Sequence, residues 1–244
     1  MINQETKEKI FDLYAATPNL VGEYPVVVSV GPIPLQTDNR KAFSNPELMD
    51  LVTDELLKLV DWHGIDLIVG AETAGMPLAT LLSYKTRIPF SYVRKKQRGR
   101  GEDTYISGRA RPGDRAILVD DLMAKGEAKT LFVENMKHDG VVTVALAMIF
   151  KTMAEYFTKN EARENLEVSG IPIYNLFTWE ELIDGLYRRG KIDKEIYPHF
   201  MDYALHPEVW QKDVSKWDVY FEVLNKLKCQ IPQSVINAVD DMRK

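Results

Sequence analysis

Two adjacent carboxylates, Asp120 and Asp121, follow an apolar run at 116–119 in the segment AILVDDLMAKGEAKT. The run is typical of a buried strand, so we expect the acids where that strand ends. A short loop with Gly126 and a helical pattern come next. Ligands of an open α/β sheet bind outside the carboxyl ends of its strands. Carboxylates there can accept hydrogen bonds from a sugar diol, and backbone amides of the loop and helix can hold a phosphate. The segment therefore indicates a site for a phosphorylated sugar.

Two further loops are expected at the same edge of the sheet. The segment GAETAG at 70–75 follows an apolar run, and its glycines allow a tight turn and close approach of the backbone to an anion. The segment VRKKQRGRGED at 93–103 is rich in cations, namely Arg94, Lys95, Lys96, Arg98 and Arg100. Such cations can stabilise the charge that develops on a polyphosphate leaving group. Each loop alone could be a plain turn or a solvated face, and it is their occurrence in order that favours a functional site.

The elements that would position these loops alternate between strands and helices. Apolar runs predict strands at 25–30, 67–69, 89–93, 116–119, 141–150 and 171–176. Helical periodicity predicts helices at 3–15, 45–63, 77–85, 127–138 and 178–189, while 94–108 is expected to be irregular. Ser44 with Glu47, and Thr178 with Glu181, have the spacing of capping boxes. The alternation predicts an α/β fold with a central, mostly parallel sheet flanked by helices.

The tail of the chain has a different pattern. Beyond residue 190, large apolar side chains recur at helical spacing, namely Trp217, Tyr220, Phe221, Leu224 and Leu227. A chain of 244 residues is long enough for one large domain with a small appendage. We therefore expect one domain over residues 1–190 and a helical C-terminal extension over 191–244 that packs on it.

The composition argues against several functional classes. A net charge of −5 does not suit a general nucleic-acid binder. The sequence has neither the roughly 18 consecutive apolar residues of a membrane span nor the apolar core of a signal peptide. The single cysteine, Cys229, cannot form an intrachain disulfide and favours a reducing compartment. We expect a soluble cytoplasmic protein that binds neither nucleic acid nor membranes.

In this order and spacing, the three loops resemble those of the type I phosphoribosyltransferases. The acid-pair segment resembles that family's signature for 5-phosphoribosyl 1-pyrophosphate. The stretches TDNRKAFSNPEL (37–48), GAETAGMPLAT (70–80), IPFSYVRKK (88–96) and RENLEVSGI (163–171) are most similar to the orotate-specific members, which serve pyrimidine biosynthesis. The resemblance covers about residues 20–190. It implies the type I phosphoribosyltransferase fold, Mg²⁺ as cofactor, and transfer of a phosphoribosyl group from the pyrophosphate to orotate.

The resemblance also implies roles for individual residues. Asp120 and Asp121 would bind the ribose hydroxyls, directly or through Mg²⁺. The 5′-phosphate would lie in the loop of Ala124, Lys125, Gly126, Glu127 and Ala128. The pyrophosphate would contact Arg94, Lys95 and the loop of Gly70, Ala71, Glu72, Thr73, Ala74 and Gly75. A mobile catalytic loop would contain Arg98, Arg100 and Glu102. In the family this loop reaches into the neighbouring subunit's site, which implies a homodimer.

Several positions differ from the family pattern. The phosphate loop lacks the family's threonine or serine hydroxyls, each worth roughly 1.5–3 kcal/mol as a hydrogen bond to a charged group. Arg98 and Arg100 stand in place of lysine and histidine, and Leu35 and Gln36 in place of aromatic residues near the base. The arginine that grips orotate has no clear counterpart, and Lys151 and Lys159 are the candidate cations. Two alternatives therefore stay open: a non-catalytic module that senses phosphoribosyl pyrophosphate or a nucleotide, and a phosphoribosyltransferase for another base.

Overall fold

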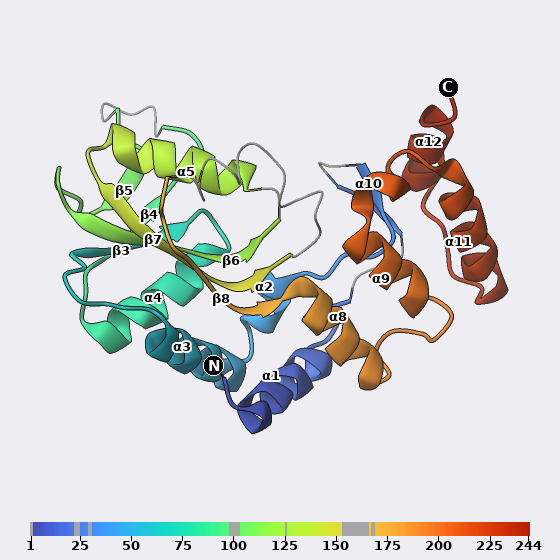
Figure 1. The fold of residues 1–244 in the computed structure, drawn as a ribbon, viewed down its shortest axis with the longest axis horizontal. Helices are drawn as coiled ribbons and strands as arrows, with labels where there is room; N and C mark the ends of the chain where they lie inside the picture. Colours follow the sequence, from blue (N-terminus) through green and yellow to red (C-terminus); the bar gives the residue numbers. More distant parts are fainter. Residues whose placement is uncertain are drawn as a thin grey trace.

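The computed structural model describes residues 2–21, 25–28, 31–97, 103–124, 126–152, 166 and 169–244. These residues form a central six-stranded sheet in the order β5-β4-β3-β6-β7-β8 (Figure 1). The strands are β3 (Leu67–Ala71), β4 (Phe90–Val93), β5 (Ile106–Gly108), β6 (Arg115–Met123), β7 (Val142–Lys151) and β8 (Ile173–Thr178). Neighbouring strands are parallel except β4 and β5. The predicted mostly parallel α/β sheet is confirmed.

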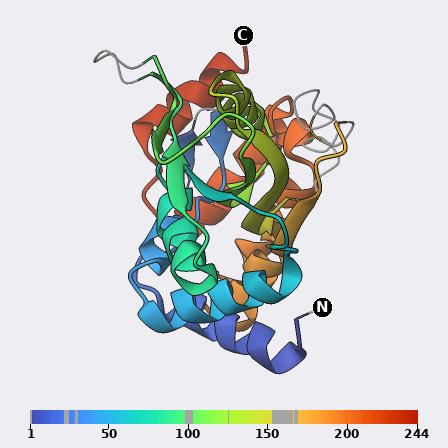
Figure 2. The same cartoon turned by 90° about the vertical axis from the view of Figure 1, so that its left-hand side faces the viewer.

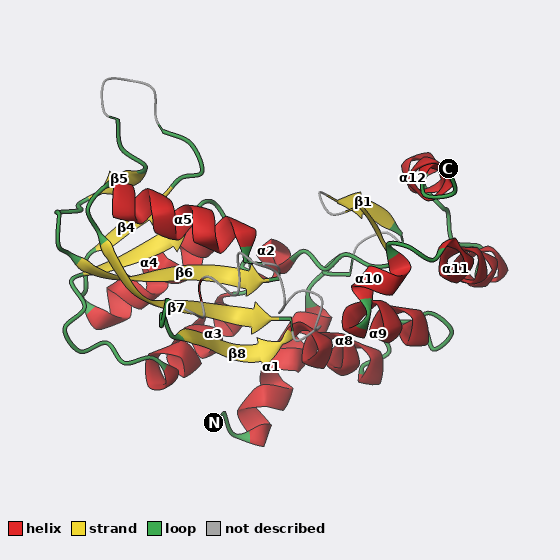
Figure 3. Cartoon of the chain, turned by 45° about the horizontal axis from the view of Figure 1, so that its top comes forward, coloured by secondary structure: helices red, strands yellow, loops and turns green. Residues whose placement is uncertain are grey.

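Helices cover both faces of this sheet. On one face lie α3 (Pro46–Leu59) and α4 (Gly75–Thr86), with α1 (Gln4–Ala16) packed on α3, and on the other lies α5 (Glu127–His138) (Figures 2 and 3). Successive residues of β3 separate between the two cores: Ile68 packs on the α3–α4 side, whereas Leu67 and Val69 pack on the α5 side. The alternation follows from the two-residue period of a strand. A sheet buried on both faces leaves its carboxyl edge as the place for a site.

Two local predictions were wrong. Helix α3 begins at Pro46 with Asn45 as its cap, because the Asn45 side chain accepts hydrogen bonds from the backbone N–H groups of Glu47 and Leu48. The Ser44 hydroxyl instead donates to the carbonyl of Lys41. The stretch 94–108 was expected to be irregular, but its end forms β5, which pairs with β4. The second capping box, Thr178 with Glu181, is confirmed.

A small hairpin lies apart from the main sheet. It consists of β1 (Val26–Val28) and β2 (Gly31–Ile33), and the short helix α2 (Asn39–Ala42) follows it. The predicted strand at 25–30 is therefore one arm of an antiparallel pair. The residues between the hairpin and α2 are tied to other parts of the chain, since Tyr220 Oη donates to the Pro34 carbonyl at 3.0 Å.

The remaining helices form the C-terminal part of the molecule. They are α8 (Trp179–Arg188), α9 (Tyr197–Leu205), α10 (Pro207–Trp210), α11 (Val214–Lys226) and α12 (Gln233–Asp241). Helix α12 contacts both hairpin strands and lies beside the hairpin (Figures 1 and 3). The helical extension is thus confirmed. Its buried residues belong to the same core as α1 and β7, and a boundary at residue 190 stays a prediction.

No helix in the described part of the chain has both the length and the apolar character that crossing a lipid bilayer needs.

Candidate active site

The strand register brings the three loops to one edge of the sheet. In β3, Gly70 pairs with Tyr92 of β4 and with Val119 of β6. The loop after Ala71 and the basic segment after Val93 therefore leave β3 and β4 at the level at which β6 reaches Val119 and the acid pair. This is the convergence that the sequence predicted, and its cause is the parallel pairing of β4, β3 and β6.

The acids lie within strand β6 rather than after it. The strand continues to Met123 because Leu122 and Met123 pair with Phe150 and Lys151 of β7. Successive residues of a strand point to opposite faces, so Asp120 and Asp121 have different surroundings although they are neighbours. Asp120 is only 7% exposed, whereas Asp121 is half-buried.

Asp120 is satisfied by groups of the protein itself. Its Oδ1 accepts a hydrogen bond from the backbone N–H of Asp121 at 2.9 Å, and its Oδ2 accepts one from Lys129 Nζ. Lys129 lies in the first turn of α5 and is also only 7% exposed. The pair therefore joins the end of β6 to the start of the helix that follows the phosphate loop.

Asp121 is the acid that is not in this ion pair. Its Oδ1 accepts a hydrogen bond from the Leu122 backbone N–H at 2.8 Å. Burial, and then the negative charge of Asp120, raise the pKa of Asp121 to about 7, although Lys129 opposes the rise. A half-buried carboxylate that is costly to ionise is well suited to accept hydroxyl donors or a cation.

The negative charge of Asp121 also affects the pKa values of two side chains that the sequence analysis did not select. Burial first, and then Asp121, raise the pKa of the Tyr14 hydroxyl, which is buried without a hydrogen-bond partner among the described residues. The pKa of Arg40 is raised mainly by its bond to Asp38, with a smaller contribution from Asp121. Arg40 Nε lies 2.8 Å from Asp38 Oδ1, and its side chain is 60% exposed. Arg40 is thus an exposed cation of α2 whose pKa also responds to Asp121.

The GAETAG loop lies directly against the acid pair. A Cβ atom on Gly75 would lie 2.1 Å from the Val119 carbonyl oxygen and 3.0 Å from Asp120 Cα, so only glycine lets α4 start this close to β6. The loop is fixed to β4 as well, because the Glu72 backbone N–H donates to the Val93 carbonyl at 3.0 Å. Ala71 is buried, and Thr73 and Ala74 complete the turn into α4.

The basic segment is attached to the same loop. The Lys95 backbone N–H donates to Glu72 Oε2 at 3.0 Å, and Glu72, Thr73, Lys95 and Lys96 line a cavity of about 410 Å³. Arg94 directs one guanidinium nitrogen at the Thr104 carbonyl, 3.3 Å away, while its buried Nε has no hydrogen-bond partner among the described residues. Two lysines, one carboxylate and the Thr73 turn therefore line this cavity, with Arg94 next to Lys95 in the chain.

The phosphate loop reaches α5 through a glycine in the left-handed region. Gly126 has a φ of 88° and immediately precedes Glu127, the first residue of α5. Ala124 and Ala128 are half-buried, and Glu127 is exposed. The start of a helix offers unpaired backbone N–H groups to an anion, which the loss of hydroxyl side chains does not remove.

Several predicted residues lie outside the described part of the chain, namely Arg98, Arg100, Glu102, Lys125 and Lys159. Lys151 ends β7. Leu35 is buried in the core, whereas Gln36 is half-buried. The predicted role of Leu35 and Gln36 near the base stays a prediction.

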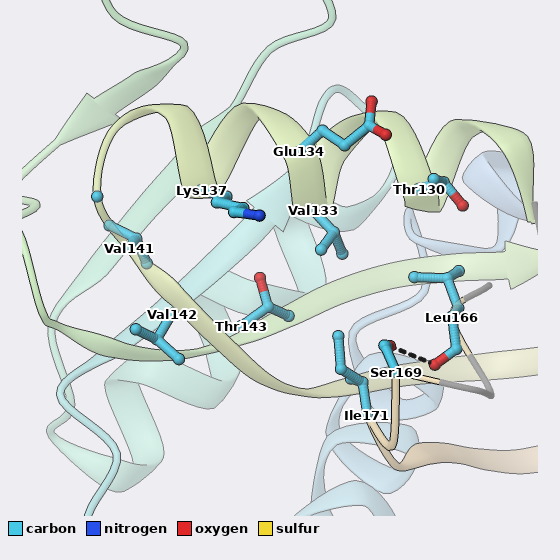
Figure 4. Close-up of a pocket in the computed structure, with 11 residues that line it drawn as sticks. Thr130, Val133, Glu134, Lys137, Val141, Val142, Thr143, Leu166, Ser169 and Ile171 are labelled. Carbon is cyan, nitrogen blue, oxygen red and sulfur yellow. Dashed lines mark hydrogen bonds between the residues drawn. The ribbon is translucent and has the colours of Figure 1, made fainter.

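A second cavity, of about 480 Å³, lies between α5 and the start of β7 (Figure 4). Val133, Val141, Val142 and Ile171 give it an apolar character, and Glu134 and Lys137 are the charged residues of its lining. It includes residues from the amino end of β7, so it does not coincide with the edge at which the three loops meet.

Sequence reasoning did not select Lys129. A lysine in the first turn of a helix is unfavourable because of the helix dipole. That position is a signal that a nearby carboxylate compensates the charge, but the partner could not be identified without the packing of α5 on β6.

A parallel sheet with an acid pair on β6, a glycine-bounded loop after β3 and a basic segment after β4 defines a type I phosphoribosyltransferase fold. The model of the phosphoribosyl transferase domain matches residues 43–179. An orotate phosphoribosyltransferase of Dinoroseobacter shibae is 33% identical over 193 residues, which cover 77% of this chain and 84% of that protein. The chain belongs to the phosphoribosyltransferase family, and it is a pentosyltransferase.

Solved structures agree on the fold. The structure of Leishmania donovani UMP synthase has a TM-score of 0.66 and 21% identity, and the match covers 80% of this chain but only 42% of that one. The chain thus spans less than half the length of that protein. Orotate phosphoribosyltransferase from Aeropyrum pernix has a TM-score of 0.62 and 20% identity, with 73% and 98% of the two chains covered.

Proposed function

We propose that this protein transfers the 5-phosphoribosyl group from phosphoribosyl pyrophosphate to orotate, which forms orotidine monophosphate and pyrophosphate. The observation that carries the proposal is the meeting of Asp121, the GAETAG loop and the basic segment at one sheet edge. The 33% identity to a relative named orotate phosphoribosyltransferase supports orotate as the base. The pathway would then be pyrimidine biosynthesis.

In this proposal, a different group of residues binds each part of the substrate. Asp121 accepts hydrogen bonds from the ribose hydroxyls, and Asp120 supports it through the Asp121 backbone N–H. The loop of Ala124, Gly126, Glu127 and Ala128 holds the 5′-phosphate through backbone amides, assisted by Lys125. The 70–75 loop, together with Arg94 and Lys95, binds the pyrophosphate. This arrangement holds the reactants together and stabilises the leaving group as the anomeric carbon gains oxocarbenium character.

Mg²⁺ fits the donor set at this edge. Burial first, and then the negative charge of Asp120, raise the pKa of Asp121, and a cation bound there would favour its ionised form. Among the described residues, no group of three or more His, Cys, Asp or Glu could enclose a metal. Mg²⁺ commonly keeps several waters and is held by one or two carboxylates with substrate phosphates. Asp121, and Asp120 more remotely, would hold it indirectly, and the bound ion would neutralise charge on the pyrophosphate.

The catalytic loop and the oligomer form one linked proposal. We propose Arg98, Arg100 and Glu102 as the loop residues that act on the leaving group from a neighbouring subunit of a cytoplasmic homodimer. The family resemblance of the basic segment supports this. If it holds, mixing the Asp121→Asn and Arg98→Ala proteins creates hybrid dimers with one intact site. Activity at low phosphoribosyl pyrophosphate should then exceed that of either variant alone. Absence of any restoration in subunit mixtures shown to exchange would contradict a shared site.

The test of the reaction is a base panel. Purified protein with Mg²⁺ and phosphoribosyl pyrophosphate is offered orotate, uracil, adenine and hypoxanthine, and pyrophosphate release is measured. We expect release with orotate. Release with a different base alone would select a phosphoribosyltransferase of other specificity. Tight binding of phosphoribosyl pyrophosphate with no turnover on any base would select the non-catalytic sensing module.

A further inference from the structure

Helix α5 connects the two anion-binding regions of the proposed site. Its first turn follows the phosphate loop and carries Lys129, which pairs with Asp120. Its last turns carry Asn135, and Asp139 follows directly. At a rise of about 1.5 Å per residue, the helix spans about 18 Å. Both ends of this helix therefore contact parts of the site.

The C-terminal end of α5 forms hydrogen bonds with two arms of the chain: the start of the basic segment, where it leaves β4, and the residues after the basic segment, where the chain enters β5. Asn135 Nδ2 donates to the Arg94 carbonyl at 2.8 Å, on the arm that leaves β4. Asp139 Oδ2 accepts from the backbone N–H groups of Tyr105 and Ile106 at 2.8 and 2.7 Å, on the arm that enters β5. The arms are also joined to each other, because the Arg94 backbone N–H donates to the Tyr105 carbonyl at 3.0 Å.

The two side chains that form these hydrogen bonds are buried. Asn135 is 5% exposed, and the side chain of Asp139 is 6% exposed. The other carboxylate oxygen of Asp139 lies 2.9 Å from Nδ1 of His138, whose ring packs edge-on against Tyr105 at 5.2 Å. A buried carboxylate with two backbone donors resists displacement more than a solvated contact does.

These hydrogen bonds restrain the residues that are proposed to bind pyrophosphate. Arg94 is held through its carbonyl by Asn135, and the next residue, Lys95, is held through its backbone N–H by Glu72. Without Asn135, one of these two restraints on the segment is lost. Lys95 and Lys96 line the cavity beside Thr73, so a small displacement of this arm moves cations away from that cavity.

We propose that Asn135 and Asp139 are positioning residues that hold Arg94 and Lys95 at the distance from the acid pair that a pyrophosphate group requires. The inference rests on the proposed function, and it assigns to α5 the role of setting the spacing between the phosphate and pyrophosphate subsites. Neither residue touches the substrate.

The test compares two probes on the same variants. Inorganic pyrophosphate with Mg²⁺ reports on the basic segment, and ribose 5-phosphate reports on the acid pair and phosphate loop. We expect Asn135→Ala and Asp139→Ala to weaken pyrophosphate binding by roughly tenfold, the equivalent of one such hydrogen bond, and to leave ribose 5-phosphate binding unchanged in calorimetry. The KM for pyrophosphate in the reverse reaction should rise accordingly.

Two further variants separate positioning from general destabilisation. Asp139→Asn keeps a carbonyl oxygen for the two backbone donors and should restore most of the pyrophosphate affinity. Asp66→Ala is the matched control, because Asp66 Oδ2 likewise accepts a backbone N–H, that of Arg115 at 2.9 Å, before the start of β3. It should leave the affinity for both probes unchanged. If Asp139→Ala fails to fold, Asn135→Ala and Asp139→Asn carry the comparison.

The outcomes distinguish this inference from the proposed function. A wild-type protein that binds both probes, with Asn135→Ala and Asp139→Ala variants that lose neither or lose both equally, overturns the positioning role alone. A wild-type protein that binds neither probe overturns the proposed function, and the inference with it.

Discussion

Asp120 and Asp121 show how two identical side chains in sequence acquire different properties. Asp120 faces the first turn of α5 and is neutralised by Lys129, whereas Asp121 has a raised pKa and no such partner. Strand alternation alone separates them. The acid pair therefore consists of one carboxylate in an ion pair within the protein and one carboxylate outside that ion pair.

The first prediction concerns Asp121→Asn. The change removes a charged acceptor for the ribose hydroxyls, and hydrogen bonds to charged groups contribute roughly 1.5–3 kcal/mol, so binding of phosphoribosyl pyrophosphate should weaken about 10- to 100-fold. Calorimetry measures the dissociation constant. Asp114→Asn is the control, because Asp114 also accepts a backbone N–H, that of Arg111, but in a turn before β6. An unchanged dissociation constant in Asp121→Asn would show that the diol binds elsewhere.

The second prediction concerns the pH dependence of stability. Folding raises the pKa of Asp121 from 3.8 to about 7, so the folded state holds its proton over a range in which the unfolded state has lost it. Stability must then fall as pH rises through this range. Asp121→Asn removes the cost, so the variant should gain stability relative to wild type between pH 3.8 and about 7. Denaturant unfolding of both proteins across the range measures this, and parallel curves would refute the assignment.

At the scale of elements, periodicity predicted most of the fold. The parallel strands and α1, α3, α4, α5 and α8 were found near their expected positions because each buries a regular apolar pattern. The continuation of β6 through the acids depends on pairing with β7, which no local pattern contains. β5 has only three residues and exists through its pairing with β4. The convergence of the three loops was predictable from strand order, whereas the Lys129 and Asn135 contacts required the packing of α5.

The third prediction concerns the ion pair between β6 and α5. Lys129→Met leaves the Asp120 carboxylate buried without its cation, and breaking a buried pair by removing one partner costs about 3–5 kcal/mol. Unfolding by denaturant should reveal a loss of that order. Adding Asp120→Asn removes the orphaned charge, so the double variant should recover part of the stability. If the single and double variants are equally destabilised, the pair is not coupled.

At the scale of the whole molecule, the C-terminal helices contact the hairpin and the chain that follows it. Trp210, Trp217 and Tyr220 are fully buried and pack edge-on against one another. The Tyr220 hydroxyl also donates a hydrogen bond to the Pro34 carbonyl, and α12 contacts the hairpin. The extension therefore supports the residues that precede Leu35 and Gln36, the positions predicted to lie near the base.

The fourth prediction concerns this support. Tyr220→Phe leaves the buried Pro34 carbonyl without its donor, which costs about 1–3 kcal/mol. We expect lower stability and a larger rise in the KM for orotate than in the KM for phosphoribosyl pyrophosphate, since the latter binds at the sheet edge. Steady-state kinetics and denaturant unfolding measure both effects. Tyr84→Phe is the control, because Tyr84 is 65% exposed, and equal changes in the two KM values would contradict a specific link to the base.

The indole of Trp179 gives the molecule a built-in optical probe. Its Nε1 donates to Thr37 Oγ1 at 3.2 Å, between the start of α8 and the chain that leads into α2. Trp210 and Trp217 are buried among the C-terminal helices. Trp62 Nε1 donates a hydrogen bond to the Leu57 carbonyl near the end of α3. Thr37 directly follows Gln36, which is predicted to lie near the base, so emission changes on adding orotate should vanish in Trp179→Phe and persist in Trp62→Phe. Binding of the base would then be measurable in real time without a label.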